Sequence, residues 1–483
     1  RRRGRARRRG RGAPRGRRHG GVPGVARGGE LEAWAGGPGF EPPRRRQRQR
    51  AGAPPCSPQT EFCLIGEATH GTHEFYQLRA DASLALLTSG ASPFAAVLIE
   101  ADWPAAARLN AYVRGHPGAT LDAALAGFRS RFAEWMWSNQ ELASFAERLR
   151  AFNATLPDAE RRGVYGLDIY ALQASADAVV AHLEAAGDVA GARAARRRFS
   201  CITRWGGGAD YARALAAGAP PCRDEAVNAL VATMRSAAAA QPGGGGPGSP
   251  AAEATLSAVA NARAVASAES YYRAMVFGGE PAWNIRDSAF LDAALLVRKT
   301  MADAAAPGAP PPRLILWAHN SHLGNAAATS MGALRGEHNV GQLLVEAFGR
   351  RKVCAVGQLT AAGTVACASS WGGRVWRRAV RPPLEGSYEA LLAASGRPSF
   401  TLDLRDPASA AATALAAPAL QRAIGVQYRP KTERPSHYFS ARLVDQFSAV
   451  VFFAESRAVD PVPVPAGWGT VLGYDDDSGA ESD

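Results

Sequence analysis

Acidic and imidazole side chains follow four short apolar runs of this sequence, where they could take part in acid–base chemistry. They are Glu67 and His70 after residues 62–65, Glu100 and Asp102 after residues 94–99, Asp168 after residues 164–167, and His319 and His322 after residues 314–317. In an open, mostly parallel sheet, the loops at the carboxyl ends of the strands lie together and form the ligand crevice. We therefore expect these side chains to share one site.

The residue types suit hydrolysis of an ester by activated water, which needs a base and a group that stabilises the oxyanion. His70 lies just before an expected helix, whose positive N-terminus disfavours the imidazolium form and keeps a neutral base available. Glu67 can accept the other ring N–H and fix the tautomer. His319 and His322 could stabilise charge or protonate the leaving alkoxide, and Arg79 could hold an anionic oxygen or position a carboxylate.

A metal-dependent hydrolase or metal-binding protein is the alternative that the same residues leave open. His70 and His73 are three residues apart, as are His319 and His322, and imidazoles with carboxylates are common ligands of divalent metals. In that case the ligands would be His70, Glu100, His319 and His322. Neither histidine pair belongs to a His-Glu-x-x-His helix, so the pattern only suggests a metal. For His73, an exposed place in the first turn of the helix is favoured over a role in the site.

Other classes of function find little support. A serine hydrolase of the usual kind would carry Gly-x-Ser-x-Gly at a strand-to-helix turn, and a phosphate-binding loop would carry a Gly-Lys pair. The sequence has neither. Nucleic-acid binding would depend on the basic first 50 residues alone, which hold 17 arginines and three glutamates, because the remaining residues carry a net charge near −1.

The chain between its two ends predicts an α/β fold. Short apolar runs alternate with long amphipathic patterns, which indicates a mostly parallel or mixed central sheet flanked by helices. The first expected helix follows Thr72 as N-cap, buries Phe75, Leu78, Ala82 and Leu86, and ends at Gly90; a second long helix is expected over residues 133–153. Residues 170–305 are overwhelmingly helical in pattern, so we expect a large helical insertion or lid within the sheet.

Composition sets the expected domain boundaries. Residues 1–59 are rich in Arg, Gly and Pro and predict a disordered tail, because they offer almost no apolar surface to bury. Residues 60–460 predict the catalytic domain, with a flexible Gly/Pro-rich insertion at 237–252, and residues 461–483 predict an acidic C-terminal tail.

The sequence offers no candidate membrane span or secretory signal, so we expect a cytoplasmic protein. The six cysteines show no Cys-x-x-Cys pair and no zinc spacing. Cys63 and Cys354 lie in apolar, strand-like runs, so we interpret them as small buried residues in a reducing compartment.

Several collinear motifs together resemble those of the erythromycin esterase family. They are Gly-Glu-Ala-Thr-His-Gly-Thr at 66–72 with Leu-Arg at 78–79, Val-Leu-Ile-Glu at 97–100, Trp-x-Trp-Ser-Asn-x-Glu at 135–141, Val-Tyr-Gly-Leu-Asp at 164–168, Asn-x-Arg-Asp at 284–287, Trp-Ala-His-Asn-x-His at 317–322, and Ser-His-Tyr-Phe at 436–439. The series spans about residues 61–460, so the resemblance does not depend on a single short motif.

The resemblance implies an esterase that hydrolyses a carboxylic ester or a macrolactone, the chemistry by which the family inactivates macrolide antibiotics. It implies a catalytic set at Glu67, His70, Arg79, Glu100, His319 and His322. We expect Asp102, Asp168 and Arg286 to bind the substrate, which is a small-molecule ester or lactone. The reaction as written needs no cofactor, although a divalent metal stays possible, and the sequence does not indicate an oligomeric state.

Overall fold

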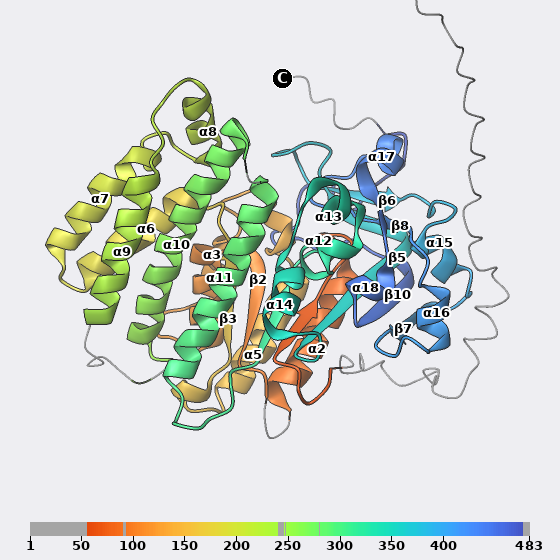
Figure 1. Cartoon of the computed structure of the whole chain (residues 1–483), viewed down its shortest axis with the longest axis horizontal. Helices are drawn as coiled ribbons and strands as arrows, with labels where there is room; N and C mark the ends of the chain where they lie inside the picture. Colours follow the sequence, from red (N-terminus) through yellow and green to blue (C-terminus); the bar gives the residue numbers. More distant parts are fainter. Residues whose placement is uncertain (1–55, 90–92, 240–245, 247, 280, 477–483) are drawn as a thin grey trace, which may run out of the picture.

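A computed structural model describes residues 56–89, 93–239, 246, 248–279 and 281–476 of the chain (Figure 1). These residues form a nine-stranded mixed sheet in the order β11-β6-β5-β1-β4-β2-β3, with β10 pairing with both β5 and β7. Its strands are β1 (Phe62–Ile65), β2 (Ala96–Asp102), β3 (Gly163–Asp168), β4 (Leu314–Trp317), β5 (Val353–Cys367), β6 (Trp376–Val380), β7 (Ser399–Asp403), β10 (Ala449–Ser456) and β11 (Val471–Leu472). The expected α/β fold with a mixed sheet is confirmed.

The neighbouring strands β1, β4, β2 and β3 run parallel and are buried along their length, with β3 at the end of the order. Burial on both faces explains the unbroken apolar sequences of β1 and β4. Successive side chains of β1 alternate between two cores. Phe62 and Leu64 pack in one core with helices α11 (Ala282–Asp303) and α14 (Val340–Phe348). Cys63 and Ile65 pack in the other with α2 (His73–Thr88) and α5 (Gln140–Asn153). The sheet is therefore the middle of three layers.

A helical unit lies between β3 and β4 in the chain and stands at the β3 side of the sheet (Figure 1). It comprises α6 (Leu172–Ala185), α7 (Val189–Thr203), α8 (Gly208–Ala216), α9 (Arg223–Ala239), α10 (Pro250–Phe277) and α11. Most of these helices share a separate apolar core. The helical character expected for residues 170–305 is therefore present. Of the flexible insertion expected at 237–252, residues 237–239 end α9 and residues 250–252 begin α10, while residues 240–245 and 247 lie outside the described residues.

The remaining helices and turns connect the strands. They are α3 (Trp103–Val113), α4 (Leu121–Ala126), η1 (Glu134–Met136), η2 (Asp158–Glu160), α12 (Asn320–Leu323), η3 (Ala326–Ala328), α13 (Ser330–Arg335), α15 (Tyr388–Ala393), α16 (Ala410–Ala414), η4 (Pro430–Thr432), α17 (Glu433–His437) and α18 (Leu443–Gln446). A two-stranded sheet of β8 (Ala419–Arg422) and β9 (Tyr438–Ala441) accompanies them. No helix within the described ranges has both the length and the apolar character needed to cross a membrane.

Two helices differ from the sequence-based expectation. The helix expected over 133–153 is split, because the side chain of Asn139 accepts a hydrogen bond from the backbone N–H of Leu142 (2.8 Å) and starts α5 there. In α2, Leu78 is only half-buried, whereas Arg79 and Ser83 are buried. Phe75 and Ala82 are buried as expected and Leu86 is half-buried, so the inner face of α2 combines the expected apolar residues with polar ones that periodicity did not predict. The expected end at Gly90 lies outside the described residues.

The two ends of the chain carry further differences. Residues 1–55 of the expected N-terminal tail lie outside the described residues. At the other end, β11 pairs with β6 beyond the domain boundary expected at residue 460.

Cys201 and Cys222 form a disulfide that the cysteine spacing did not predict. Since disulfides are typical of oxidising environments, this bond removes the cysteine argument for a reducing compartment.

Candidate active site

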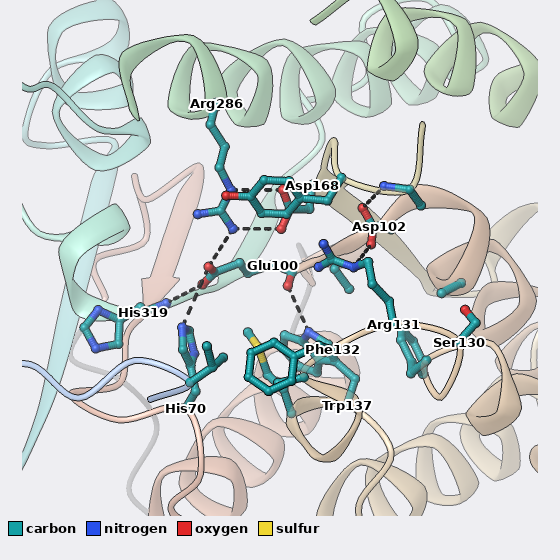
Figure 2. Close-up of a pocket in the computed structure, with 18 of the residues that line it drawn as sticks. His70, Glu100, Asp102, Ser130, Arg131, Phe132, Trp137, Asp168, Arg286 and His319 are labelled. Carbon is teal, nitrogen blue, oxygen red and sulfur yellow. Dashed lines mark hydrogen bonds and ion pairs between the residues drawn. The ribbon is translucent and has the colours of Figure 1, made fainter. Parts of the chain in front are cut away.

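The polar side chains expected to converge do so around one cavity of about 360 Å³ (Figure 2). The cavity lies at the carboxyl ends of β1, β2, β3 and β4, with α6 and α11 of the helical unit on its far side. Its polar lining includes His70, Glu100, Asp102, Asp168, Arg286, His319 and His322. Glu67 and Arg79 are fully buried behind this lining and do not reach the cavity.

The loop that carries His70 is held close to the neighbouring strands. A side chain at Gly66 would collide with the Asn320 side chain, and one at Gly71 would collide with the backbone of Ala366. Both positions therefore require glycine for close approach, which accounts for the spacing of the Gly-Glu-x-x-His-Gly motif. The hydroxyl of Tyr76 donates to the carbonyl of His70 (2.8 Å) and fixes the loop against α2.

His70 is oriented by Glu67. Its Nδ1 lies 3.0 Å from Glu67 Oε1, and its Nε2 faces the cavity, 3.9 Å from Glu100 Oε1. A carboxylate only accepts hydrogen bonds, so the ring donates its Nδ1–H to Glu67 and presents the Nε2 lone pair to the cavity. This arrangement fits a general base.

Arg79 acts on Glu67 rather than on the cavity. Its Nη1 lies 2.8 Å from Glu67 Oε2, although the angle does not suit a hydrogen bond. The guanidinium carbon lies 3.7 Å from the centroid of the Tyr76 ring, with Trp137 and Trp317 also facing it. Of the two roles expected for Arg79, the geometry suits positioning a carboxylate and does not suit holding an anionic oxygen of the substrate.

Glu100, near the end of β2, joins three cavity residues. Its Oε1 lies 2.9 Å from Arg286 Nη2 and 3.3 Å from His322 Nε2, and its Oε2 accepts the backbone N–H of His319 (2.9 Å). Burial acts to raise the pKa of this carboxyl, but His322, His70 and Arg286 outweigh burial and hold the pKa well below its usual value. The carboxyl is therefore ionised at neutral pH and is a weak base.

The ring of His319 lines the cavity, and its Nε2 is buried from solvent. His319 precedes α12, and its Nδ1 accepts the backbone N–H of Ser321 (3.2 Å), so the neutral ring carries its proton on Nε2. This buried Nε2 has no hydrogen-bond partner among the described residues. Burial, and then His70, lower the pKa of His319 to about 3, while Glu100 and the Ala68 carbonyl oppose the shift. His319 is therefore a neutral donor at pH 7.

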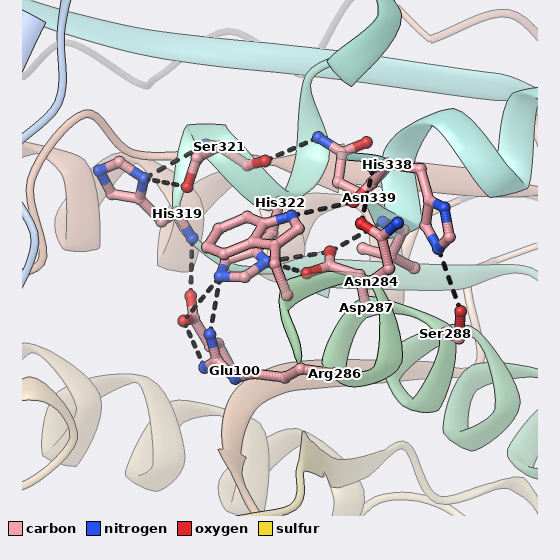
Figure 3. Close-up of polar contacts among 12 residues, drawn as sticks. Glu100, Asn284, Arg286, Asp287, Ser288, His319, Ser321, His322, His338 and Asn339 are labelled. Atoms are coloured by element: carbon pink, nitrogen blue, oxygen red, sulfur yellow. Dashed lines mark hydrogen bonds and ion pairs between the residues drawn. The ribbon is translucent and has the colours of Figure 1, made fainter. Parts of the chain in front are cut away.

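His322 lies between two carboxylates (Figure 3). Its Nδ1 is 2.9 Å from both oxygens of Asp287, and its Nε2 faces Glu100. Burial lowers its pKa, but Asp287 and Glu100 outweigh burial and raise the pKa to about 9. Arg286 Nη1, 3.0 Å from Nε2, favours a neutral ring. We assign the charged ring at pH 7, because two carboxylates oppose a single guanidinium.

The three residues expected to bind substrate line the cavity but are already engaged with protein groups. Arg286 of α11 binds Asp168 at the end of β3 through two hydrogen bonds, of 3.0 and 2.7 Å. Asp102 accepts the backbone N–H of Ala171 (2.7 Å) and pairs with Arg131 (2.7 Å). These contacts tie the helical unit and the loop before η1 to the cavity wall.

His73 takes a different place from the exposed one expected. It is half-buried, and its Nδ1 lies 2.5 Å from Glu141 Oε1 of α5 while its Nε2 lies 2.6 Å from Arg457. It does not line the cavity. The partners of His73 are 68 and 384 residues away in the sequence, so local periodicity could not reveal them.

Sequence reasoning assigned no role to several residues of the site. Asp287 is one, although it stands next to Arg286 in the motif at 284–287. The others are aromatic residues. Trp283 stacks on His322 with ring centroids 4.4 Å apart, and the ring centroids of Phe132 and Trp371 are 4.9 Å apart. Both Phe132 and Trp371 line the cavity. Aromatic residues usually belong to the core, so no sequence signal separates these from the rest.

The contacts of the cavity residues bear on the alternative metal site. In the part of the chain that the structure describes, no three His, Cys, Asp or Glu side chains are grouped as they would be around a metal ion. Glu100 already forms ion pairs with Arg286 and His322. The lone pair of His319 Nδ1 accepts the backbone N–H of Ser321, so it is not available to a metal ion in the cavity. The set of His70, Glu100, His319 and His322 therefore does not fit a metal ion in this arrangement.

Comparisons with known proteins agree with this fold. A family model described as erythromycin esterase matches residues 91–456. Among solved structures, a succinoglycan biosynthesis protein aligns at 18% identity and a TM-score of 0.63, over 83% of this chain and 89% of its own. A protein from Bacillus cereus aligns at 15% and 0.62, over 90% and 99%. A histidine-to-asparagine variant of the erythromycin esterase EreC, in its open conformation, aligns at 16% and 0.55, over 83% and 91%. At these identities the structural likeness concerns the fold.

Proposed function

This chain belongs to the erythromycin esterase family, and from that membership we propose that it is a hydrolase which cleaves a carboxylic ester or lactone with water activated by His70. The observation that carries the proposal is that His70 and His319 face one cavity with opposite hydrogen-bonding character. His70 Nε2 is an acceptor, and the neutral His319 ring is a donor whose buried Nε2–H has no hydrogen-bond partner among the described residues. An ester hydrolase that uses water needs both.

His70 is a better base than the carboxylate beside it. The pKa of Glu100 is held well below its usual value by its cationic neighbours, and a base is most effective when its pKa lies near the working pH. Glu67, supported by Arg79, keeps the Nδ1 proton in place, so the lone pair stays on the cavity side.

The reaction follows from this pair. His70 Nε2 removes a proton from water as the water oxygen adds to the carbonyl carbon of the substrate. The carbonyl oxygen becomes an oxyanion, to which His319 donates its Nε2–H. The tetrahedral intermediate then expels the alkoxide, which takes the proton back from His70. Every proton is returned, and no serine needs to act as a nucleophile.

The cavity supports a substrate with an apolar body. Its lining combines carboxylates, imidazoles and Arg286 with the aromatic rings of Phe132, Trp137, Tyr170 and Trp371. Its volume of about 360 Å³ is at the lower end of the range of roughly 300–1,000 Å³ for small-molecule sites. A macrolide lactone, on which the named esterase relative acts, is one candidate, and a smaller lactone or ester is the other.

The test is hydrolysis by the purified full-length protein. A panel of macrolactones, small lactones and simple esters is incubated with the protein, with and without a strong chelator, and mass spectrometry detects addition of one water. The proposal expects hydrolysis of at least one compound at a rate that the chelator does not change. Activity that the chelator abolishes and zinc or manganese restores would favour the metal-dependent alternative, and no hydrolysis across the panel would contradict the proposal.

A further inference from the structure

Two arginines that the hydrolytic steps do not use line the active-site cavity. Arg108 belongs to α3 and Arg131 to the loop before η1, and both border the cavity together with Ser130. Figure 2 shows Ser130 and Arg131 on the side of the cavity away from His319. The chemistry at the histidines therefore leaves this side of the cavity to another part of the substrate.

Arg108 brings a positive charge without a protein partner. It lies four residues after Pro104, which also lines the cavity, so it stands on the same face of α3 about 5.4 Å further from the end of β2. The side chain is exposed, and its Cδ lies 3.2 Å from where a Cβ would stand at Gly127. Arg108 forms no hydrogen bond or ion pair with another described residue. Its guanidinium is therefore free to bind an anion.

Arg131 is held by the protein through only part of its guanidinium. Its Nε lies 2.7 Å from Asp102 Oδ2, and its guanidinium carbon lies 4.7 Å from the centroid of the Tyr170 ring. Within the ranges that the structure describes, its Nη1 and Nη2 donate no hydrogen bond, and the side chain is 36% exposed. Asp102 and Tyr170 therefore orient the guanidinium while two of its nitrogens stay available to a ligand.

The charges of the site are unevenly distributed between its two sides. Carboxylates outnumber cations by one in the network that joins the histidines to the helical unit, whose charged members are Glu100, Asp168, Asp287, Arg286 and His322. On the other side, Arg108 and Arg131 stand against Asp102 alone. An anionic group is therefore disfavoured beside the histidines and favoured beside the two arginines.

We propose that the substrate is an acidic ester or lactone, whose carboxylate binds Arg108 and Arg131. Its ester carbonyl then lies across the cavity, at His70 and His319. This inference rests on the proposed hydrolase function and names the class of substrate. A guanidinium can donate two parallel hydrogen bonds to a carboxylate, and one excess positive charge matches a monoanion. The aromatic lining between the two sides suits the apolar chain that joins the two groups of the substrate.

Matched pairs of esters test the proposal on the full-length protein. The 4-nitrophenyl half-esters of adipate, pimelate and suberate carry a free carboxylate at increasing distance from the ester, and a primary amide replaces that carboxylate in the partner of each pair. The ratio of kcat/KM within a pair measures the preference for the anion. We expect a ratio of about tenfold or more for at least one chain length, the lower range for a hydrogen bond to a charged group.

Variants of Arg108 assign that preference to the site. We expect the ratio to fall several-fold in Arg108→Gln and to recover in Arg108→Lys, which restores the charge. Arg129→Gln is the matched control, because Arg129 lies in the same loop as Arg131, does not line the cavity and places its Nη2 3.2 Å from Asp122 Oδ1. A wild-type ratio near one at every chain length would overturn the proposal, as would equal falls in Arg108→Gln and Arg129→Gln.

Binding without hydrolysis separates this inference from the hydrolase proposal. Isothermal titration calorimetry compares the anilides of the same half-acids with their primary-amide partners, which need not be cleaved in order to bind. If no ester is hydrolysed, but the acidic anilide binds about tenfold more tightly and Arg108→Gln removes the difference, the anion site stands and the hydrolase proposal fails. Equal affinities of the two anilides for the wild type would overturn the anion site, whatever the esters show.

Discussion

The imidazole rings of His70 and His319 face each other with centroids 5.0 Å apart and planes inclined by 53° (Figure 2). His70 is backed by Glu67, and His319 is backed by the N–H of Ser321. Two histidines of similar burial are thus given opposite roles by their hydrogen-bond partners, one as a base and the other as a donor.

Replacing His319 by Leu removes the neutral N–H donor. We expect kcat to fall about 100- to 1,000-fold, as for removal of one oxyanion donor, with little change in KM. Steady-state kinetics on the substrate found by the panel would measure both constants. Ser321→Ala is the control: its hydroxyl lies 2.8 Å from His319 Nδ1, but the backbone N–H remains. A similar loss in both variants would mean that general disturbance of the loop, rather than the donor, lowers activity.

Replacing Glu67 by Gln removes the charge that orients His70. The amide can present an N–H to Nδ1 and so favour the wrong tautomer. We expect kcat to fall by about 10- to 100-fold, less than loss of the base itself. Arg79 would then lose its ion pair, so the melting temperature is measured alongside the kinetics. Full activity in Glu67→Gln would remove Glu67 from the mechanism.

Replacing Trp371 by Ala tests the aromatic wall of the cavity. Trp371 is 64% exposed and touches the Phe132 ring, so its loss should change the unfolding free energy by no more than about 0.5 kcal/mol. We expect KM to rise several-fold while kcat stays nearly constant, because a wall that binds substrate and transition state equally affects KM alone. A fall in kcat at unchanged KM would contradict this role.

The raised pKa of His322 predicts how stability depends on pH. Its pKa is about 9 in the folded protein, above the ordinary histidine value of 6.5, so the charged ring stabilises the fold fully below about pH 6.5. That contribution is lost as pH rises through 9. Its size is about 3 kcal/mol at 1.36 kcal/mol for each pKa unit. Denaturant unfolding at pH 6.5 and pH 9.5 should reveal the loss in wild type and a smaller one in His322→Gln. Equal losses would place the titrating group elsewhere.

The sequence predicted the sheet well because its central strands are unbroken apolar runs. The bounds expected for β1 and β4 agree with the structure, and the polar residues after them meet as expected, since parallel strands bring their carboxyl ends together. Within the motif that contains Glu67 and His70, spacing alone was enough to suggest their contact.

Contacts between residues that are far apart in the sequence could not be predicted from motif spacing. Arg79 is buried on the inner side of α2, where its ion pair with Glu67 and its aromatic neighbours stabilise it. The sequence predicted His73 as an exposed residue of the first helical turn, whereas the structure pairs it with Glu141 and Arg457. Phe132 and Trp371 are far apart in the sequence, and nothing local marks them as neighbours across a cavity.

The central claim is that His70 activates the water. His70→Asn keeps a polar side chain of similar size but no base, and His73→Asn is the matched control, because His73 lies on the same loop–helix junction outside the cavity. Circular dichroism and melting temperature would establish that both variants fold.

The most direct measurement is kcat/KM for these two variants on the hydrolysed substrate. The account predicts a fall of at least about 100-fold in His70→Asn, the lower range for loss of a general base, and a fall of less than about tenfold in His73→Asn, which has no place in the cavity. A folded His70→Asn protein that keeps activity within tenfold of wild type, or equal losses in both variants, would contradict the assignment of His70 as the base.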